Sequence, residues 1–350
     1  MAARTELAAP SVGWKWWLGA FAALFGAIVL GALVGPASIG FVDAIRVLVS
    51  LAPGVELATD LSELEQGILE VVRFPRVFLA VLVGASLSLS GAAYQGVFRN
   101  PLADPYLLGV AAGAGLGATL AIVFAGGGAD SVVPIIPAAA FVGAIVGVLL
   151  SYGLGRTVGG ARTVTSLILA GVAVAAFLTA IQTFVQQRNA ETLREVYDWI
   201  LGRLVTTGWS EFKLILPYVL ISAVGIFVHR RALDVMSVGD EEASSLGLQV
   251  GRTRLIVVAS ATLGAAAAVA VAGLIGFVGI IVPHAVRLVA GTSYRRVLPL
   301  SALLGGAFLV LADIVARSVL APAEVPIGVV TAFLGAPFFV LVLRTSRRVM

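Results

Sequence analysis

Residues 74–97 read FPRVFLAVLVGASLSLSGAAYQGV and contain a single charged side chain, Arg76. An apolar helix of about 20 residues crosses the roughly 30 Å hydrocarbon layer of a membrane, and this stretch is long enough to do so. Several of its central positions are small, and residues such as Ser86, Ser90 and Gly91 let two helix backbones approach closely within lipid. The stretch therefore predicts a membrane-spanning helix that packs inside a tight bundle.

The composition of the whole chain extends this prediction to a polytopic membrane protein. Of the 350 residues, 59% are hydrophobic and only 12% are charged, and the mean hydropathy is +1.04. Soluble domains carry about 25% charged residues. The isoelectric point near 9.8 does not indicate nucleic-acid binding, because most basic residues are arginines at the ends of apolar runs, where they set membrane orientation. The chain has no cysteine, which excludes disulfides and thiol chemistry.

Ten stretches are apolar enough to span, so the predicted fold class is all-α, with about ten transmembrane helices in one transmembrane domain over residues 1–350. The eighth stretch is short and contains Gly276, Gly279 and Pro283, so a broken or tilted helix is expected there. The predicted spans are 17–35, 74–97, 106–125, 133–153, 164–187, 212–229, 255–273, 275–290, 298–317 and 326–343.

The distribution of Lys and Arg predicts that both termini are cytoplasmic. With the N-terminus inside, most of the 23 basic residues fall on the inner side, as the Lys/Arg bias requires. An amphipathic helix within residues 191–204 is expected to lie along the membrane face. A cleaved signal peptide is the alternative for the first apolar run, although that run is long enough to span. The non-spanning segments are then a cytoplasmic N-terminus at 1–16, extracellular segments at 36–72 and 188–211, and a cytoplasmic loop at 230–254.

The sequence lacks the motifs of an ATPase and of an ion-driven pump. Neither Lys15 nor Lys213 lies in the glycine-rich P-loop motif, so this chain is not expected to bind ATP in that way. His229 and His284 have no partner cluster, so no metal site is expected. Only Asp313 lies deep in a predicted span, with a basic residue one helical turn later. A proton-coupled transporter, which would need acids within its spans, is therefore disfavoured.

A short polar insert, Gly239–Gly247, lies between two long apolar stretches. Asp240, Glu241 and Glu242 open it, where the N-terminus of a helix favours negative charge. Gly247 closes it, where a left-handed C-cap favours glycine. Flanking arginines place the insert in the cytoplasm. It therefore predicts a rigid capped helix displayed to a partner, and a solvated connector between two spans is the alternative.

Three arginines, Arg73, Arg76 and Arg317, fall at the outer ends of predicted spans, against the usual bias of positive charge. Snorkelling to lipid headgroups is the simpler explanation for them. An outward docking site for an acidic surface on another protein is the alternative.

Several motifs follow one another in order between about residues 70 and 345. They are Arg73-Phe74-Pro75-Arg76, the loop RNPLADPYLLG at 99–109, the insert at 239–247, GFVGIIVPHAVR at 276–287, ADIVAR at 312–317 and PIGVVTAFLGAP at 326–337. In this order and spacing, the chain closely resembles the FecCD-type membrane permeases of ABC importers for cobalamin, ferric siderophores and haem.

The resemblance implies a homodimeric permease of a type II ABC importer with ten spans per chain. Its expected partners are a second copy of itself, two cytoplasmic ABC ATPase subunits, an extracellular substrate-binding protein and membrane lipid, but no nucleic acid. The chain on its own is then no enzyme and binds no cofactor, because ATP and Mg²⁺ belong to the partner ATPase. The implied location is the plasma or inner membrane of the cell.

The resemblance also assigns roles to residues. Arg73, Arg76 and Arg317 match positions that grip acidic residues of the binding protein, which makes docking the preferred explanation for them. Ala243 and Leu246 would give the insert a small apolar contact surface. The implied coupling helix for the ATPase is Gly239, Asp240, Glu241, Glu242, Ala243, Leu246 and Gly247.

Two further groups are implied in the same way. Thr163, Val164 and Thr165 match the cytoplasmic gate, although threonine at this position could also cap a helix. A signature loop is expected to be structural and close to the ATPase, with turn-forming pairs and Asp104 as a cap for the third span. Its residues are Asn100, Pro101, Asp104, Pro105 and Gly109.

The leading expectation is an ATP-driven importer permease that forms the pathway for a large metal chelate. Cobalamin is the first choice of substrate, and ferric siderophores and haem are alternatives that share the same motifs. An ion-coupled secondary transporter is the alternative of a different class, and a scaffold or channel without energy input is a third.

Overall fold

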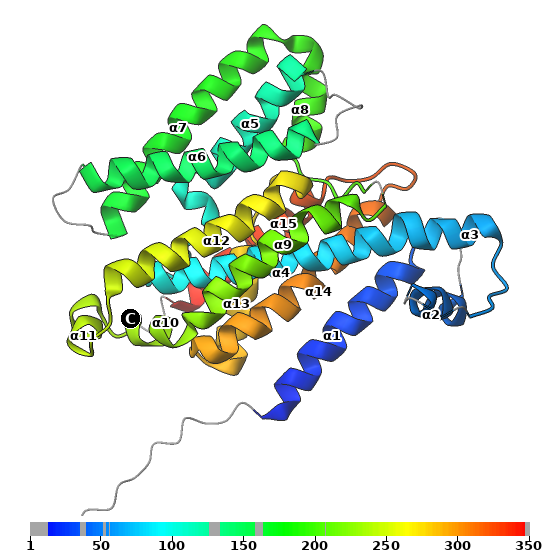
Figure 1. Ribbon diagram of the computed structural model, residues 1–350, viewed down its shortest axis with the longest axis horizontal. Coiled ribbons are helices and arrows are strands. Elements are labelled where there is room, and N and C mark those ends of the chain that lie inside the picture. Colours follow the sequence, from blue (N-terminus) through cyan, green and yellow to red (C-terminus); the bar gives the residue numbers. More distant parts are fainter. Residues whose placement is uncertain are drawn as a thin grey trace, which may run out of the picture.

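The computed structural model describes residues 13–35, 40–51, 54–55, 57–125, 134–157, 164–206 and 208–346, and every regular element within them is helical. Figure 1 shows α4 crossing the middle of the bundle, with α5, α6 and α7 grouped on one side of α12. The elements are α1 Trp14–Leu33, α2 Phe41–Ser50, α3 Glu63–Gly67, η1 Ile68–Arg73, α4 Phe74–Phe98, η2 Pro105–Leu108, α5 Val110–Ala125, α6 Ile135–Thr157, α7 Val164–Arg188, η3 Ala190–Thr192, α8 Leu193–Ile200, α9 Ser210–Val228, α10 Arg230–Met236, α11 Asp240–Ser245, α12 Val250–Ala272, α13 Val278–Ala290, α14 Tyr294–Ser318 and α15 Ile327–Ser346.

The number of membrane-spanning helices agrees with the prediction. In the described part of the chain, seven helices are long and apolar enough to cross a membrane. Three shorter apolar helices, α5, α13 and the described part of α15, bring the set to ten. The all-α polytopic fold is confirmed.

The second span begins earlier than predicted. The helix runs unbroken from Glu63 to Phe98, so the segment predicted as extracellular at 36–72 includes its first turns. Ser62 and Glu65 form a reciprocal capping box that starts the helix. The turns at 68–73 are wider than an α-helix, and Phe74 donates its N–H to the carbonyl of Leu69. This widening precedes Pro75, which has no N–H to give and whose ring crowds the preceding turn.

The structure bears out one of two sequence predictions about irregular segments, the amphipathic helix within residues 191–204. α8 is a short amphipathic helix that buries Val196 and Trp199. It ends where Gly202 adopts a positive φ of 78°. The eighth predicted span, 275–290, is not broken as expected. α12 ends at Ala272 and α13 is one helix that starts at Val278, so residues 275–277 belong to the non-helical connection between the two helices. The backbone between them is held by Tyr106, whose hydroxyl donates to the carbonyl of Ile275 at 3.0 Å.

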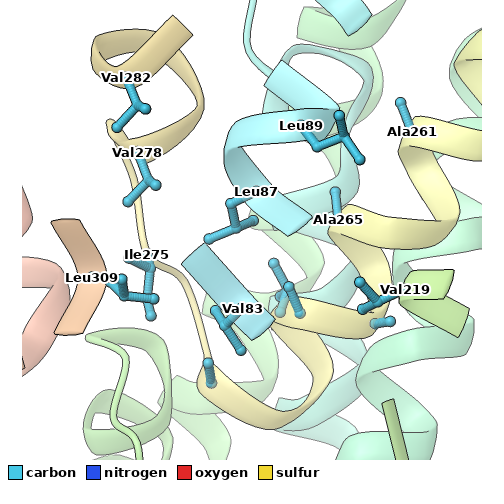
Figure 2. Close-up of a cluster of buried hydrophobic side chains, with 14 of the residues drawn as sticks. Val83, Leu87, Leu89, Val219, Ala261, Ala265, Ile275, Val278, Val282 and Leu309 are labelled. Carbon is cyan, nitrogen blue, oxygen red and sulfur yellow. The ribbon is translucent and has the colours of Figure 1, made fainter. Parts of the chain in front are cut away.

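α4 is the helix around which the others pack. Figure 2 shows Val83 and Leu87 of α4 among side chains from α9, α12, α13 and α14. The backbones meet closely at glycines: a Cβ on Gly84 would overlap the carbonyl oxygen of Gly305, and one on Gly91 would overlap that of Gly279. The small-residue pattern of residues 74–97 is therefore a packing surface, as the sequence predicts.

We expect Gly91→Ala to lower the thermal stability of the protein in detergent, because the added methyl group would force α4 and α13 apart. Overpacking of this kind costs about 1–3 kcal/mol. The control is Gly153→Ala on α6, where nothing lies within 4 Å of the added Cβ. Equal melting temperatures for the two variants would contradict the close approach at Gly91.

Candidate functional site

The polar insert forms the capped helix that its sequence predicts. α11 starts after Gly239, which has a φ of 140°, and ends before Gly247, which has a φ of 84°. Leu248 donates its N–H to the carbonyl of Ala243 at 3.1 Å, the six-residue closure of a Schellman cap. Figure 1 shows α11 at one end of the bundle, which we call the α11 end, and α2 and α3 at the opposite end.

α11 is fastened to the bundle by charge and by packing. Asp240 pairs with Arg254 of α12 at 2.7 Å and with Arg99, next to α4, at 3.4 Å. Ala243 is fully buried against Met236 and Val250, so it anchors the helix and cannot be an outer contact. This corrects the expectation that Ala243 contributes contact surface.

The exposed side of α11 is formed by three other predicted residues. Leu246 is 71% exposed and is the apolar side chain that this helix presents outward. Glu241 and Glu242 are also exposed. The surface available to a partner at this position is therefore one leucine, two acids and the hydroxyls of Ser244 and Ser245.

The signature loop is built from turns that lock one another. Asn100 accepts the N–H of Leu102 at 2.9 Å through its side chain. Asp104 accepts the N–H of Tyr106 at 2.8 Å. It therefore caps η2, which includes Pro105, and not α5 directly as predicted. Gly109 follows η2 with a φ of 83° and leads into α5.

A polar cavity of about 540 Å³ lies beside this loop, near α11. We call it the α11-side cavity. Its walls come from the end of α4, from α10, and from α13 with the turn that leads into α14. The sequence motifs at 99–109 and 276–287 thus meet in one place, a juxtaposition that their spacing does not reveal. The lining residues are Gln95, Gly96, Arg99, Asn100, Pro101, Asp234, Ser237, Arg287, Thr292, Ser293 and Tyr294.

The three outer arginines converge at the end of the bundle opposite α11. Arg76 binds Asp313 of α14 at 2.8 Å and Glu324, in the loop before α15, at 2.7 Å. Asp313 also pairs with Arg317 at 3.5 Å, as the sequence analysis expects for residues one turn apart. The hydrogen bonds from Arg76 lower the pKa of Glu324 below its usual value. Asp313 is thus shared between two cations.

Arg73 and Arg317 are held by backbone carbonyls of α1. Arg73 is 3% exposed and donates to Ala32 at 3.0 Å. Arg317 donates to Gly31 at 2.6 Å. These two guanidinium groups therefore connect η1 and α14 to the end of α1 and offer little surface to a second protein.

Sequence reasoning missed another cation at this end, Arg203. Its side chain is exposed and forms no ion pair with any residue that the structure describes. It lines a pocket of about 250 Å³ together with Arg76, Asp198 and Glu324. The signal in the sequence was its position within the extracellular segment predicted at 188–211, just after the amphipathic helix.

The predicted gate is described only in part. Thr163 lies outside the described residues, and Val164 is the first residue of α7. Thr165 is exposed on the first turn of that helix. Its role as a gate stays a prediction.

The histidines do not form a metal site within the described residues, where no group of three potential metal ligands comes together. His284 packs its ring edge-on against Phe338, with ring centres 6.0 Å apart. His229 follows the last residue of α9, and its ring nitrogen lies 2.8 Å from the carbonyl oxygen of Gly225.

These features define a polytopic helical membrane protein with a capped helix at one end and a charged cluster at the other. Comparison of sequences gives its family: the chain belongs to the FecCD transport family, whose model matches residues 23–345. Members of this family are membrane permease subunits of ABC importers, in which a partner subunit hydrolyses ATP.

Individual relatives cover most of the chain. The cobalamin import system permease of Halobacterium salinarum is 41% identical over 98% of this chain and 87% of its own length. An iron(III)-citrate import permease of Bacillus subtilis is 36% identical over 80% of this chain and 83% of its own. The hemin transport permease of Yersinia pestis is 38% identical over 78% of this chain and 82% of its own length.

A solved structure shares the fold. It is an inward-facing conformation of a transporter of the metal-chelate ABC type, with a TM-score of 0.81 and 28% sequence identity. The match covers 95% of this chain and 99% of that one.

We expect Asp313→Asn to destabilise the protein strongly, because it leaves Arg76 and Arg317 without their shared buried counter-charge. Breaking a buried ion pair from one side costs about 3–5 kcal/mol. Glu324→Gln should cost less than about 1 kcal/mol, because the Glu324 side chain is 46% exposed. Thermal melting of the two purified variants measures the difference, and similar losses would argue against a central role for Asp313.

Proposed function

We propose that this chain forms the translocation pathway of an ATP-driven importer for a large metal chelate. The single observation that carries the proposal is α11, a rigid helix fastened through Asp240 and Ala243 that presents Leu246 at one end of a ten-helix bundle. Because α11 is held to α12 in this way, a displacement of α11 by a partner is transmitted to α12. The FecCD family membership supports the same class of function.

We infer that the chelate is cobalamin. The relative named for cobalamin import is 41% identical to this chain, and relatives named for iron(III)-citrate and hemin are 36% and 38% identical. Iron-siderophore and haem import are therefore the alternative substrates. Each long helix other than α14 carries at most two charged residues, which suits a wide and weakly polar pathway for a bulky chelate.

We infer that the working unit is a homodimer with two ATPase subunits at the α11 end and a binding protein at the opposite end. α7 and α15 expose large side chains such as Phe177, Phe184 and Phe333, which suits contact with lipid or with a second copy. Thr163, Val164 and Thr165 would form the gate on the ATPase side. Both termini would then be cytoplasmic, in the plasma or inner membrane.

We infer that the binding protein docks through acidic residues on the arginines of the end opposite α11. Of the three predicted docking arginines, Arg76 is the one that lines the pocket of about 250 Å³. Arg203 lines the same pocket, is exposed and has no ion-pair partner among the described residues. Arg73 and Arg317 support this surface from below through their bonds to α1. Charge complementarity of this kind governs the association rate and its dependence on salt.

The coupling role of α11 predicts that replacing Glu241, Glu242 and Leu246 together with alanine abolishes ATP-driven uptake in liposomes. The fold should survive, because these side chains are exposed. A matched control is the replacement of both Ser244 and Ser245 with alanine, since these residues are exposed on the same helix. Unchanged uptake by the triple variant would refute coupling through α11.

The docking proposal predicts that Arg203→Glu weakens binding of the substrate-binding protein by about tenfold and reduces the salt dependence of its affinity. Arg194→Glu, on an exposed α8 position outside the pocket, is the charge-matched control. Surface plasmon resonance at several salt concentrations measures both. An identical affinity for wild type and Arg203→Glu would exclude Arg203 as a docking residue.

The class and the substrate are tested together by reconstitution with the ATPase and the binding protein. Cobalamin accumulation that requires both ATP and the binding protein is the expected result. Coupled ATPase activity without cobalamin uptake would point to an iron chelate. Uptake that survives without ATP but collapses with the ion gradient would favour a secondary transporter.

A further inference from the structure

We propose that the α11-side cavity receives an acidic side chain of the ATPase subunit, as a second contact beside α11. This inference rests on the proposed ATPase partnership. It concerns a site that involves a different helix, α13, and a different charge from those of α11.

The cavity has a fixed, buried floor. Gln95 is 2% exposed and donates to the carbonyl of Gly279 at 3.1 Å. Its side-chain oxygen accepts a hydrogen bond from Arg287 of α13. Tyr294 is 7% exposed and accepts from Arg287 at 3.3 Å. The guanidinium group of Arg287 is therefore positioned before any ligand arrives.

The charge of that floor is not neutralised within the described part of the chain. The two groups that hold Arg287, the amide of Gln95 and the hydroxyl of Tyr294, are both neutral. Its guanidinium carbon also lies 5.6 Å from the centre of the Tyr294 ring. No carboxylate of a described residue lies within ion-pair distance of Arg287. A partly buried cation without a counter-charge favours an incoming anion.

The one acid in the lining, Asp234, already accepts hydrogen bonds from other residues of the chain. It accepts the backbone N–H of Tyr294 at 2.6 Å and the hydroxyl of Ser293 at 3.1 Å, which caps the start of α14. Arg99, at the rim, pairs with Asp240 at 3.4 Å, but Asp240 lies closer to Arg254. The lining thus holds two cations against a single acid that serves a helix cap.

The shape and position of the cavity favour a protein side chain as the occupant. The lining contains no large aliphatic residue along which a lipid chain could lie. Its rim residues Arg99, Ser237 and Thr292 are exposed, so the mouth is open to the side of α11. Because Arg99 lines the cavity and also contacts Asp240 of α11, a protein seated on α11 would reach the mouth.

The two contacts would require opposite charges on the ATPase. The acids Glu241 and Glu242 of α11 favour basic partners, whereas Arg287 and Arg99 favour a carboxylate. The first contact acts on α12 through Arg254, and the second acts on α13 through Arg287. A partner that engages both would hold the two helices on either side of the break at 273–277.

The test measures binding of the cognate ATPase to the permease in nanodiscs, with Thr292 replaced by Glu or by Gln. Thr292 is exposed at the rim, so both variants should fold. We expect Thr292→Glu to weaken binding by about tenfold, because it places a negative charge where the carboxylate enters, and Thr292→Gln to stay within about twofold of wild type. Raising the salt concentration should reduce the difference in affinity between the two variants. Equal affinities for the Glu and Gln variants would overturn the proposal.

A second readout uses the absence of cysteine from the chain. Thr292→Cys would be the single thiol, and its alkylation by a maleimide should slow by about tenfold when the ATPase is bound, as burial at an interface excludes the reagent. The control Ala190→Cys is exposed at η3, away from the cavity, and should react at one rate throughout. Unchanged labelling at both positions would show that the ATPase leaves the cavity open.

The outcomes separate this inference from the proposed function. If the ATPase does not bind wild-type permease at all, the importer assignment fails. If the ATPase binds wild-type permease and binds the α11 triple variant more weakly, but binds the two Thr292 variants with equal affinity, only the cavity inference fails.

Discussion

The close approach of α4 to its neighbours is the constraint on which the rest of the structure depends. Gly84 lies against Gly305 and Gly91 against Gly279, with backbone in contact with backbone. In lipid there is little hydrophobic force between helices, so such contacts and interhelical hydrogen bonds supply the cohesion. Ser86 adds one of these bonds to the carbonyl of Gly264 at 2.9 Å. Both ends of α4 thereby acquire fixed positions, with Arg76 near one end and Arg99 just beyond the other.

The charged residues follow from that central helix. At one end Arg76 meets Asp313 and Glu324, and at the other Arg99 meets Asp240. The buried cluster around Asp313 balances cations that would otherwise be costly within the membrane. The α11 end instead leaves Arg287 without an acid among the described residues. The buried charges around Asp313 are therefore paired within the chain, whereas Arg287 at the α11 end has no described acid beside it.

Helix number and the capped insert were predictable from sequence, because hydropathy and capping residues are local signals. The glycines and proline of the eighth stretch suggested a broken helix, whereas α13 is continuous and only starts late, at Val278. The early start of the second span had a local signal too, the Ser62–Glu65 capping box, but the polar residues around it suggested a loop. The partners of the outer arginines were not predictable beyond the pair of Asp313 and Arg317. Arg76 lies 248 positions from Glu324, and no periodicity relates them. The burial of Ala243 likewise depends on Met236 and Val250, which only the folded chain brings to it.

The break between α12 and α13 determines what kind of motion can pass along the chain. An α-helix is stiff in torsion, because each turn is bonded to the next, so a twist applied to one end appears at the other. After Gly273, whose N–H makes the last such bond of α12, the connection at 274–277 is not helical and is held by Tyr106 through the backbone of Ile275. Phe277, with a φ of 71°, reverses the backbone direction just before α13 begins. A twist of α12 therefore has no helical hydrogen bonds through which to reach α13, whereas a movement of α12 along its own axis pulls on α13 through the covalent chain.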